Sequence, residues 1–169
     1  MISVHVEKLI VSRETMPSAI ILRPDDPEGD GTWFIPIWTG TTEAASLYLA
    51  LEEEKLPRPL THDLMIDALT SLDSYVDHAL VTHAKGRVFY AKIALRHHGR
   101  LIELDARPSD ALSLALKQGA KIFVTEDLVD SSSYRYVADE KLTSEEEIEA
   151  FRSFVESLTP DDFSESSPS

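Results

Sequence analysis

Segments with the apolar alternation of β-strands come in groups along this chain, not singly between helices. Three precede the first helical pattern and three follow the second, at residues 2–11, 18–22, 33–38, 75–84, 88–95 and 101–106. Strands that follow one another through short turns pair in antiparallel fashion, whereas parallel neighbours need a long crossover connection. The grouping therefore predicts an α+β fold with a largely antiparallel sheet and helices packed against it.

Helical patterns separate these groups and follow them. They are expected at residues 43–54, 61–72 and 108–118, with a further strand at 121–125. Thr41 or Thr42 is expected to cap the first helix and Thr61 the second, because a threonine oxygen can accept the unpaired N–H groups of a first turn. Pro108 suits the first turn of the third helix, and Gly119 suits a left-handed helix end.

The chain after residue 139 differs in composition from what precedes it. We expect one domain over residues 1–139, an acidic helix over 140–158 that a Thr-x-x-Glu capping box begins, and a disordered Ser/Asp/Pro-rich tail over 159–169. The acidic helix carries an apolar stripe made of Ile148, Phe151, Phe154 and Val155. The stripe favours packing over the sheet. Docking on a partner, or self-association, is the alternative.

The net charge is −14, with 30 acidic and 16 basic residues, and residues 140–169 hold half of it. Non-specific nucleic-acid binding usually depends on a basic surface, which this balance does not supply. Phosphate chemistry would therefore need a local arginine cluster or a bound divalent cation. The absence of cysteine excludes disulfides, thiolate zinc sites and cysteine nucleophiles.

No segment has the length or polarity of a membrane anchor. The longest unbroken apolar run, residues 47–51, is too short to cross a bilayer, so no membrane association is expected. His5, Glu7 and Lys8 stand where a secretory signal would need apolar residues. We therefore expect a cytoplasmic location.

A weak internal repeat is the best functional clue in the sequence. Arg58-Pro59 and Arg107-Pro108 each precede a helix that starts with a hydroxyl residue and an acid. If the two halves face each other, both arginines and both helix N-termini would lie close together. Helix N-termini and guanidinium groups together form anion sites.

The first of these motifs, residues 58–63, has two interpretations. As a site, Arg58 would hold a phosphate, His62 would act as general acid or base, and Asp63 would orient His62 or bind a metal. As local structure, Thr61 would cap the helix, Asp63 would complement the helix dipole, and Arg58 would pair with a carboxylate. Capping explains the threonine and the aspartate but leaves the histidine unexplained.

The second motif, residues 105–110, places two carboxylates around an arginine at a strand-to-helix junction. As a site, Asp105 and Asp110 would bind Mg²⁺ through their oxygens while Arg107 grips the substrate. As local structure, Ser109 and Asp110 would cap the helix, and Arg107 would neutralise one of the acids. Spacing alone favours the structural interpretation of both motifs.

Four blocks of residues together resemble the bifunctional nuclease domain family, over residues 1 to about 135. The blocks are Ile35-Pro36-Ile37-Trp38, then Arg58-Pro59-Leu60-Thr61-His62-Asp63-Leu64, then Phe89-Tyr90-Ala91, and Asp105-Ala106-Arg107-Pro108-Ser109-Asp110-Ala111. The resemblance implies an α+β domain, self-association and, as in characterised plant members, DNase and RNase activity. Thr39 replaces the family's usual aliphatic residue, and an acidic segment stands where some bacterial relatives append a UvrB/C-like motif.

The leading hypothesis is a metal-dependent phosphodiesterase that acts on DNA or RNA. The residues that match the family motifs are Glu43, Arg58, Thr61, His62, Asp63, Asp105, Arg107, Ser109 and Asp110. The two arginines would neutralise the scissile phosphate, the two hydroxyl residues would bind substrate, and His62 would activate water or protonate the leaving oxygen. Asp63, Asp105 and Asp110, with Glu43, would hold Mg²⁺ or Mn²⁺.

The alternative hypothesis is a non-catalytic oligomeric module that binds a small anionic ligand or a protein partner. The net charge and the lack of a basic surplus favour it. It also explains both motifs as helix caps and ion pairs. The two hypotheses differ over whether the arginines, the carboxylates and the histidine share one pocket.

Overall fold

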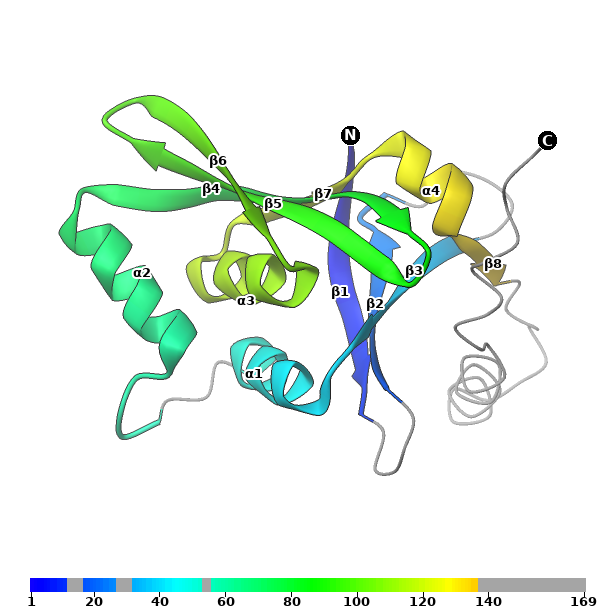
Figure 1. Ribbon diagram of the computed structural model, residues 1–169, viewed down its shortest axis with the longest axis horizontal. Coiled ribbons are helices and arrows are strands. Elements are labelled where there is room, and N and C mark those ends of the chain that lie inside the picture. Colours follow the sequence, from blue (N-terminus) through cyan, green and yellow to red (C-terminus); the bar gives the residue numbers. More distant parts are fainter. Residues whose placement is uncertain (12–16, 27–31, 53–55, 137–169) are drawn as a thin grey trace.

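A single sheet organises the protein (Figure 1). The computed structural model describes residues 1–11, 17–26, 32–52 and 56–136, and within them the strand order is β6-β5-β4-β7-β1-β2-β3-β8. The strands are β1 Ile2–Ile10, β2 Ser18–Pro24, β3 Thr32–Thr39, β4 Ser74–Lys85, β5 Val88–His97, β6 Arg100–Ala106, β7 Lys121–Val124 and β8 Tyr134–Tyr136. The helices are α1 Thr41–Leu51, α2 Thr61–Ser71, α3 Pro108–Gln118 and α4 Glu126–Ser132.

The sheet consists of two antiparallel meanders that β7 joins. Strands β1, β2 and β3 form one meander, and β4, β5 and β6 form the other. Strand β7 pairs antiparallel with β1 and parallel with β4. Residues His98 (φ 46°) and Gly99 (φ 79°) make the tight turn between β5 and β6, where two positive φ angles suit a two-residue hairpin loop. The predicted α+β fold with a largely antiparallel sheet is confirmed.

Helix α3 is the centre of the helical layer. It packs against β4 and β5 on one side, and both α1 and α2 contact it on the other (Figure 1). Its buried residues are Pro108, Ser109, Ala111, Leu112, Ser113, Leu114 and Ala115. Small residues at several of these positions let the helix approach the sheet closely. Gly119 ends α3 in the left-handed conformation (φ 65°), as expected from the sequence.

Two described elements were not expected from the sequence, α4 and β8. Thr125 caps α4, since its Oγ1 accepts a hydrogen bond from the Leu128 N–H at 3.2 Å. Strand β8 extends the sheet by pairing with β3. The predicted acidic helix over residues 140–158 and the tail over 159–169 lie outside the described residues. Among the helices of the described ranges, none has the length and apolar character to span a membrane.

Burial of α3 predicts a large cost for Leu112→Ala. Leu112 is fully buried in the main core, so the substitution removes apolar contacts and leaves a cavity. We expect the free energy of unfolding to fall by about 2–5 kcal/mol in a urea titration. Leu101→Ala, on the exposed face of β6, is the matched control and should cost about 0.5 kcal/mol. Equal effects of the two substitutions would contradict the central place of α3.

Candidate functional site

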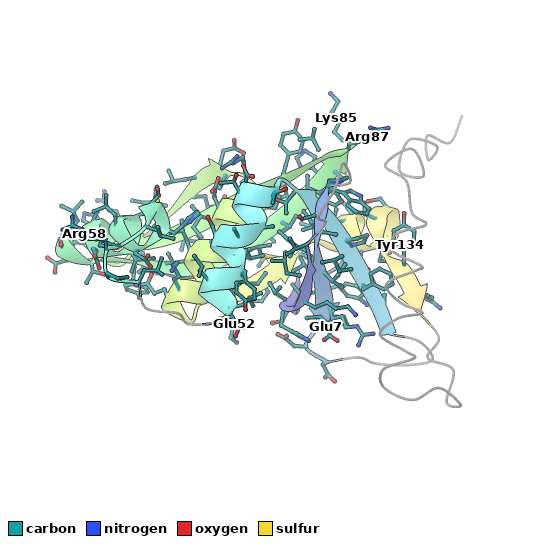
Figure 2. All side chains as sticks on the ribbon, turned by 90° about the horizontal axis from the view of Figure 1, so that it is seen from below. Glu7, Glu52, Arg58, Lys85, Arg87 and Tyr134 are labelled. Atoms are coloured by element: carbon teal, nitrogen blue, oxygen red, sulfur yellow. The ribbon has the colours of Figure 1, made fainter. Side chains whose placement is uncertain are left out.

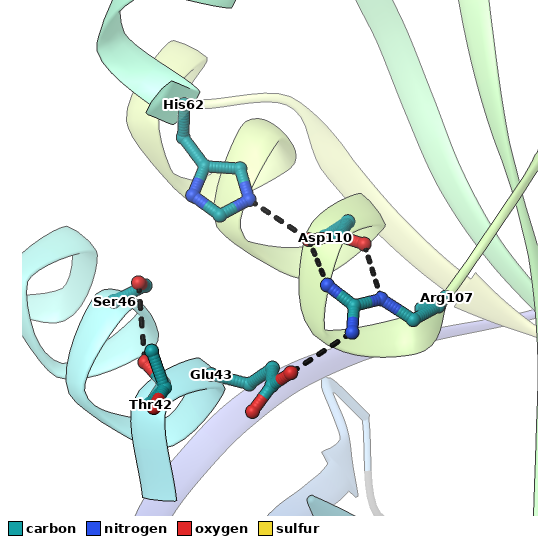
Figure 3. Close-up of polar contacts among 6 residues, drawn as sticks. All are labelled: Thr42, Glu43, Ser46, His62, Arg107 and Asp110. Atoms are coloured by element: carbon teal, nitrogen blue, oxygen red, sulfur yellow. Dashed lines mark hydrogen bonds and ion pairs between the residues drawn. The ribbon is translucent and has the colours of Figure 1, made fainter. Parts of the chain in front are cut away.

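The first turns of α1, α2 and α3 meet around one pocket (Figure 3). Its volume is about 270 Å³. Its lining residues are Thr42, Glu43, Ser46, Leu60, Thr61, His62, Arg107, Ser109 and Asp110. The N-terminus of a helix carries partial positive charge and N–H groups without partners inside the helix. Three such ends beside one pocket make it suited to an anion.

Side chains from all three helices form one continuous network in this pocket (Figure 3). Arg107 donates from Nη1 to Glu43 Oε1 at 2.8 Å, from Nε to Asp110 Oδ2 at 2.7 Å and from Nη2 to Asp110 Oδ1 at 3.3 Å. His62 Nε2 lies 3.1 Å from Asp110 Oδ1. The guanidinium therefore bridges α1 and α3, and Asp110 extends the bridge to α2.

The network favours the charged forms of Asp110 and Arg107. Burial opposes ionisation of Asp110, but hydrogen bonds from Arg107 and His62 outweigh it and hold the pKa of this carboxyl below its ordinary value. The hydrogen bond to Asp110, followed by its charge and the hydrogen bond to Glu43, raises the pKa of Arg107. Asp110 is therefore an ionised acceptor across the physiological pH range.

His62 is held in a defined orientation. An ionised carboxylate only accepts hydrogen bonds, so Nε2 of His62 carries the proton that it shares with Asp110. In the neutral ring, Nδ1 then keeps a lone pair, on the opposite side of the ring from Asp110 (Figure 3). The side chain of His62 is 16% exposed and lines the pocket. This arrangement allows the imidazole to take or give a proton at Nδ1.

The helix caps differ from those expected. The N-cap residues are Gly40, Leu60 and Arg107, and none has a side chain that caps the helix through an oxygen. The helices begin at Thr41, Thr61 and Pro108. The hydroxyl residues therefore lie inside the first turns and not at the N-cap positions, where a side-chain oxygen could accept the unpaired N–H groups. The predicted capping by these residues is wrong. Thr61 and Ser109 line the pocket instead.

Asp63 stabilises the start of α2 and does not line the pocket. Its Oδ2 accepts a hydrogen bond from the Leu60 N–H at 2.9 Å, and Lys117 Nζ of α3 donates to its Oδ1 at 2.6 Å. The hydrogen bond from Lys117, and then that from Leu60, lower the pKa of Asp63. This carboxylate fixes α2 against α3, and the structural interpretation of Asp63 accounts for its contacts.

Arg58 and Asp105 also lie outside this pocket. Arg58 is exposed at one end of the molecule, two residues before the N-cap of α2, and makes no hydrogen bond or ion pair with a described residue (Figure 2). Asp105 is exposed on β6, in register with Lys92. The expected meeting of two arginines is therefore not observed, because Arg107 is itself an N-cap residue whereas Arg58 precedes one.

Of the residues singled out in the sequence, the structure brings together Glu43, Thr61, His62, Arg107, Ser109 and Asp110. The described part of the chain holds no group of three or more His, Asp or Glu side chains arranged to bind a metal ion. The predicted ligand set that combined Asp105 with Asp110 and Glu43 is therefore not assembled. Two carboxylates, Glu43 and Asp110, remain in the pocket.

Thr42 and Ser46 of α1 line the pocket, and neither was identified from the sequence as a site residue. They lie one turn apart, and Ser46 Oγ donates to the Thr42 carbonyl oxygen at 3.2 Å. Their spacing from Glu43 places all three on neighbouring positions of the helix surface. Recognition of Glu43 as a site residue, followed by inspection of its helical neighbours, would have found them.

The sequence of residues 20–136, which is most of the chain, matches the family model of the bifunctional nuclease domain. This chain belongs to the bifunctional nuclease domain family. The matched segment includes every lining residue of the pocket. The resemblance expected from the sequence blocks is confirmed.

This bifunctional nuclease domain also has relatives with long matching segments. "Uncharacterized protein MT1877" of Mycobacterium tuberculosis (strain CDC 1551 / Oshkosh) is 35% identical over 141 residues, which cover 80% of this chain and 84% of the relative. "Uncharacterized protein Rv1829" of Mycobacterium tuberculosis (strain ATCC 25618 / H37Rv) matches with the same identity and coverage. Their names assign no activity.

The contacts of Asp63 predict a pH-dependent loss of stability in Asp63→Asn. Because the pKa of Asp63 is lowered on folding, its contribution is present above about pH 4 and is lost as the pH falls through the lowered value. We expect the substitution to cost about 1 kcal/mol at pH 7, and the difference from wild type to be smaller at pH 2, in urea titrations at both pH values.

Asp67→Asn, at an exposed position of the same helix, is the matched control and should change stability by less than about 0.5 kcal/mol at pH 7. A difference for Asp63→Asn that persists unchanged at pH 2 would contradict the role of its ionised form.

Proposed function

We propose that this protein is a nuclease that hydrolyses phosphodiester bonds of DNA or RNA in the pocket formed by α1, α2 and α3. One observation carries the proposal: an imidazole that a carboxylate orients lies beside a guanidinium at the junction of three helix N-termini. Oriented imidazoles move protons, and guanidinium groups with helix N-termini bind phosphate. Membership of the family supports the same chemistry.

Each residue of the network receives a role in this proposal. Arg107, whose side chain is 65% exposed, turns from Glu43 toward a phosphate oxygen and neutralises the charge that develops in the transition state. Asp110 keeps His62 in one orientation. His62 Nδ1 takes a proton from the attacking water or gives one to the leaving oxygen. Thr61 and Ser109 donate hydrogen bonds from their hydroxyl groups to the substrate.

The charge balance of the pocket supports a divalent cation. Glu43 and Asp110 contribute two negative charges, whereas Arg107 contributes one positive charge, so the pocket needs further positive charge to attract a phosphodiester. Mg²⁺ is commonly held by one or two carboxylates together with substrate phosphates. Glu43 and Asp110 would hold Mg²⁺ or Mn²⁺ in this way, and the bound ion would stabilise charge on the phosphate.

The nuclease proposal predicts large losses of activity in His62→Asn and Arg107→Gln. Protein stripped with chelator and supplied with Mg²⁺ or Mn²⁺ is assayed on single-stranded and duplex DNA and RNA. We expect the cleavage rate to fall about 10²–10⁴-fold in His62→Asn and about 10²–10³-fold in Arg107→Gln. Without restored metal, we expect the wild-type rate to fall at least tenfold.

The controls are His98→Asn and Arg100→Gln, which change the same residue types at exposed positions of the β5–β6 hairpin. Asparagine suits the positive φ at position 98. Both controls should keep the wild-type rate. Cleavage that survives in His62→Asn and Arg107→Gln would come from a contaminant and would contradict the proposal. Full activity in the presence of chelator would contradict the proposed requirement for a metal ion.

Self-association is proposed for α2. This helix has no buried residue, and Leu64 within it and Leu72 at its C-cap are 60% and 65% exposed. Leu64 and Ala68 lie four residues apart and therefore share one side of the helix, and Leu72 follows at the C-cap. An apolar surface of this kind on a folded domain marks an interaction site. We propose that a second copy of this chain covers it.

The double substitution Leu64→Glu/Leu72→Glu tests this surface. We expect the molar mass from light scattering after size-exclusion chromatography to fall from that of an oligomer to that of one chain, because charges would be buried at the contact. Leu101→Glu, at an exposed leucine of β6, should leave the mass unchanged. A monomeric wild-type protein, or an oligomer that the double substitution leaves intact, would contradict the proposal.

A further inference from the structure

A second pocket adjoins the first, and of its lining residues the chemistry proposed above uses only those that the two pockets share. It lies where β3 ends, α1 and α3 begin, and β5 begins, and its volume is about 240 Å³. It shares Glu43, Arg107 and Ser109 with the first pocket. A ligand group in the second pocket would therefore lie directly beside a phosphate at Arg107.

The walls of the second pocket are apolar and aromatic. Ile37 and Phe89 are buried side chains of the main core that line it, and Trp38, which packs against the second cluster of Ala19, Ile21 and Phe34, is a further lining residue. Pro108 and Val88 complete the apolar lining. Aromatic and apolar surfaces bind flat rings by stacking, and nucleic-acid proteins use such surfaces for bases of any sequence. The first pocket, in contrast, is lined mainly by charged and hydroxyl side chains.

Cations flank this second pocket. Arg107 lines it on the side of the first pocket, and Arg87 lines it on the side of the β4–β5 hairpin. Lys85 projects beside Arg87 at the end of that hairpin (Figure 2). In a chain with a net charge of −14, this grouping of positive charge is local. An apolar pocket between cations matches a base between the phosphates of a polynucleotide.

The size of the pocket restricts what can enter. Pockets for drug-sized ligands are about 300–1,000 Å³, and this one is smaller, so it has room for a single ring system. A base inside a duplex is stacked and paired, and it enters a protein pocket only after extrusion, which costs a few kcal/mol. An unpaired base enters without that cost.

We propose that the second pocket receives the nucleobase next to the scissile phosphate, and that this protein therefore prefers unpaired nucleotides. The apolar lining of the pocket contacts the base, and Arg87 binds the following phosphate. The inference rests on the proposed nuclease function, and it names the part of the substrate that the apolar side of the site recognises.

Fluorescence of Trp38 tests this proposal without any cleavage. The chain has two tryptophans, so Trp33→Phe leaves Trp38 as the reporter. In the presence of Mg²⁺, we expect adenosine 5′-monophosphate to quench this emission and to bind at least tenfold more tightly than ribose 5-phosphate, which lacks the base. A single-stranded oligonucleotide should displace the nucleotide at least tenfold more effectively than a blunt duplex of the same sequence.

Trp38→Leu and Trp33→Leu form a matched pair, because both residues lie on β3 and are partly buried but only Trp38 lines the second pocket. Calorimetry should show at least fivefold weaker nucleotide binding in Trp38→Leu and unchanged binding in Trp33→Leu, with circular dichroism confirming that both fold. The proposal would be overturned if the nucleotide and ribose 5-phosphate bound with equal affinity, or if the nucleotide bound without quenching Trp38. Equal competition by duplex and single-stranded oligonucleotides would also overturn it.

The binding and cleavage measurements separate the two proposals. Base-dependent binding with no cleavage of any oligonucleotide would overturn the nuclease function and leave a nucleotide pocket. Cleavage that needs His62 and Arg107, together with binding that ignores the base, would overturn the base pocket and leave the nuclease.

Discussion

Burial of α3 between the sheet and the other helices is the constraint on which the rest of the structure depends. Seven of its residues are buried, so neither its axis nor its first turn can move without disrupting the core. Helices α1 and α2 both contact α3, and the three N-termini therefore meet. Arg107 and Asp110 stand at the start of this fixed helix, where they contact Glu43 and His62.

A strongly acidic chain can still bind phosphate if positive charge is concentrated at one place. Here Arg107 and three helix N-termini surround the first pocket, and Arg87 of the β4–β5 hairpin lines the second. The remaining surface repels nucleic acid at long range, so binding would depend on short-range contacts and on a divalent ion. In the proposed nuclease, such an arrangement would favour contact with one short stretch of nucleic acid over coating of a long polymer.

Local patterns in the sequence predicted most elements but not their long-range neighbours. Apolar segments between turn residues identified the strands of both meanders, and two-residue alternation was clear in β1, where Val4 and Val6 pack in the core while His5 and Glu7 are exposed. It could not place β7 between β1 and β4, since pairing partners leave no local trace. Helix α4 escaped detection because its seven residues are too few for a helical period. The helix caps were predicted at the wrong residues, because the sequence alone does not distinguish a threonine inside the first turn from a threonine at the N-cap.

The candidate site was also predictable only in part, because local motifs do not show which distant residues meet. His62, Arg107 and Asp110 were identified from their motifs, but spacing alone could not tell that Arg58 lies outside the pocket while Glu43 lies inside it. The pocket also spans the junction of the two meanders: Glu43 follows β3, whereas Arg107 follows β6. Strand β7, only four residues long, connects those halves. Because Glu43 and Arg107 follow strands of different meanders, the distance between them depends on how this short strand holds the two meanders together.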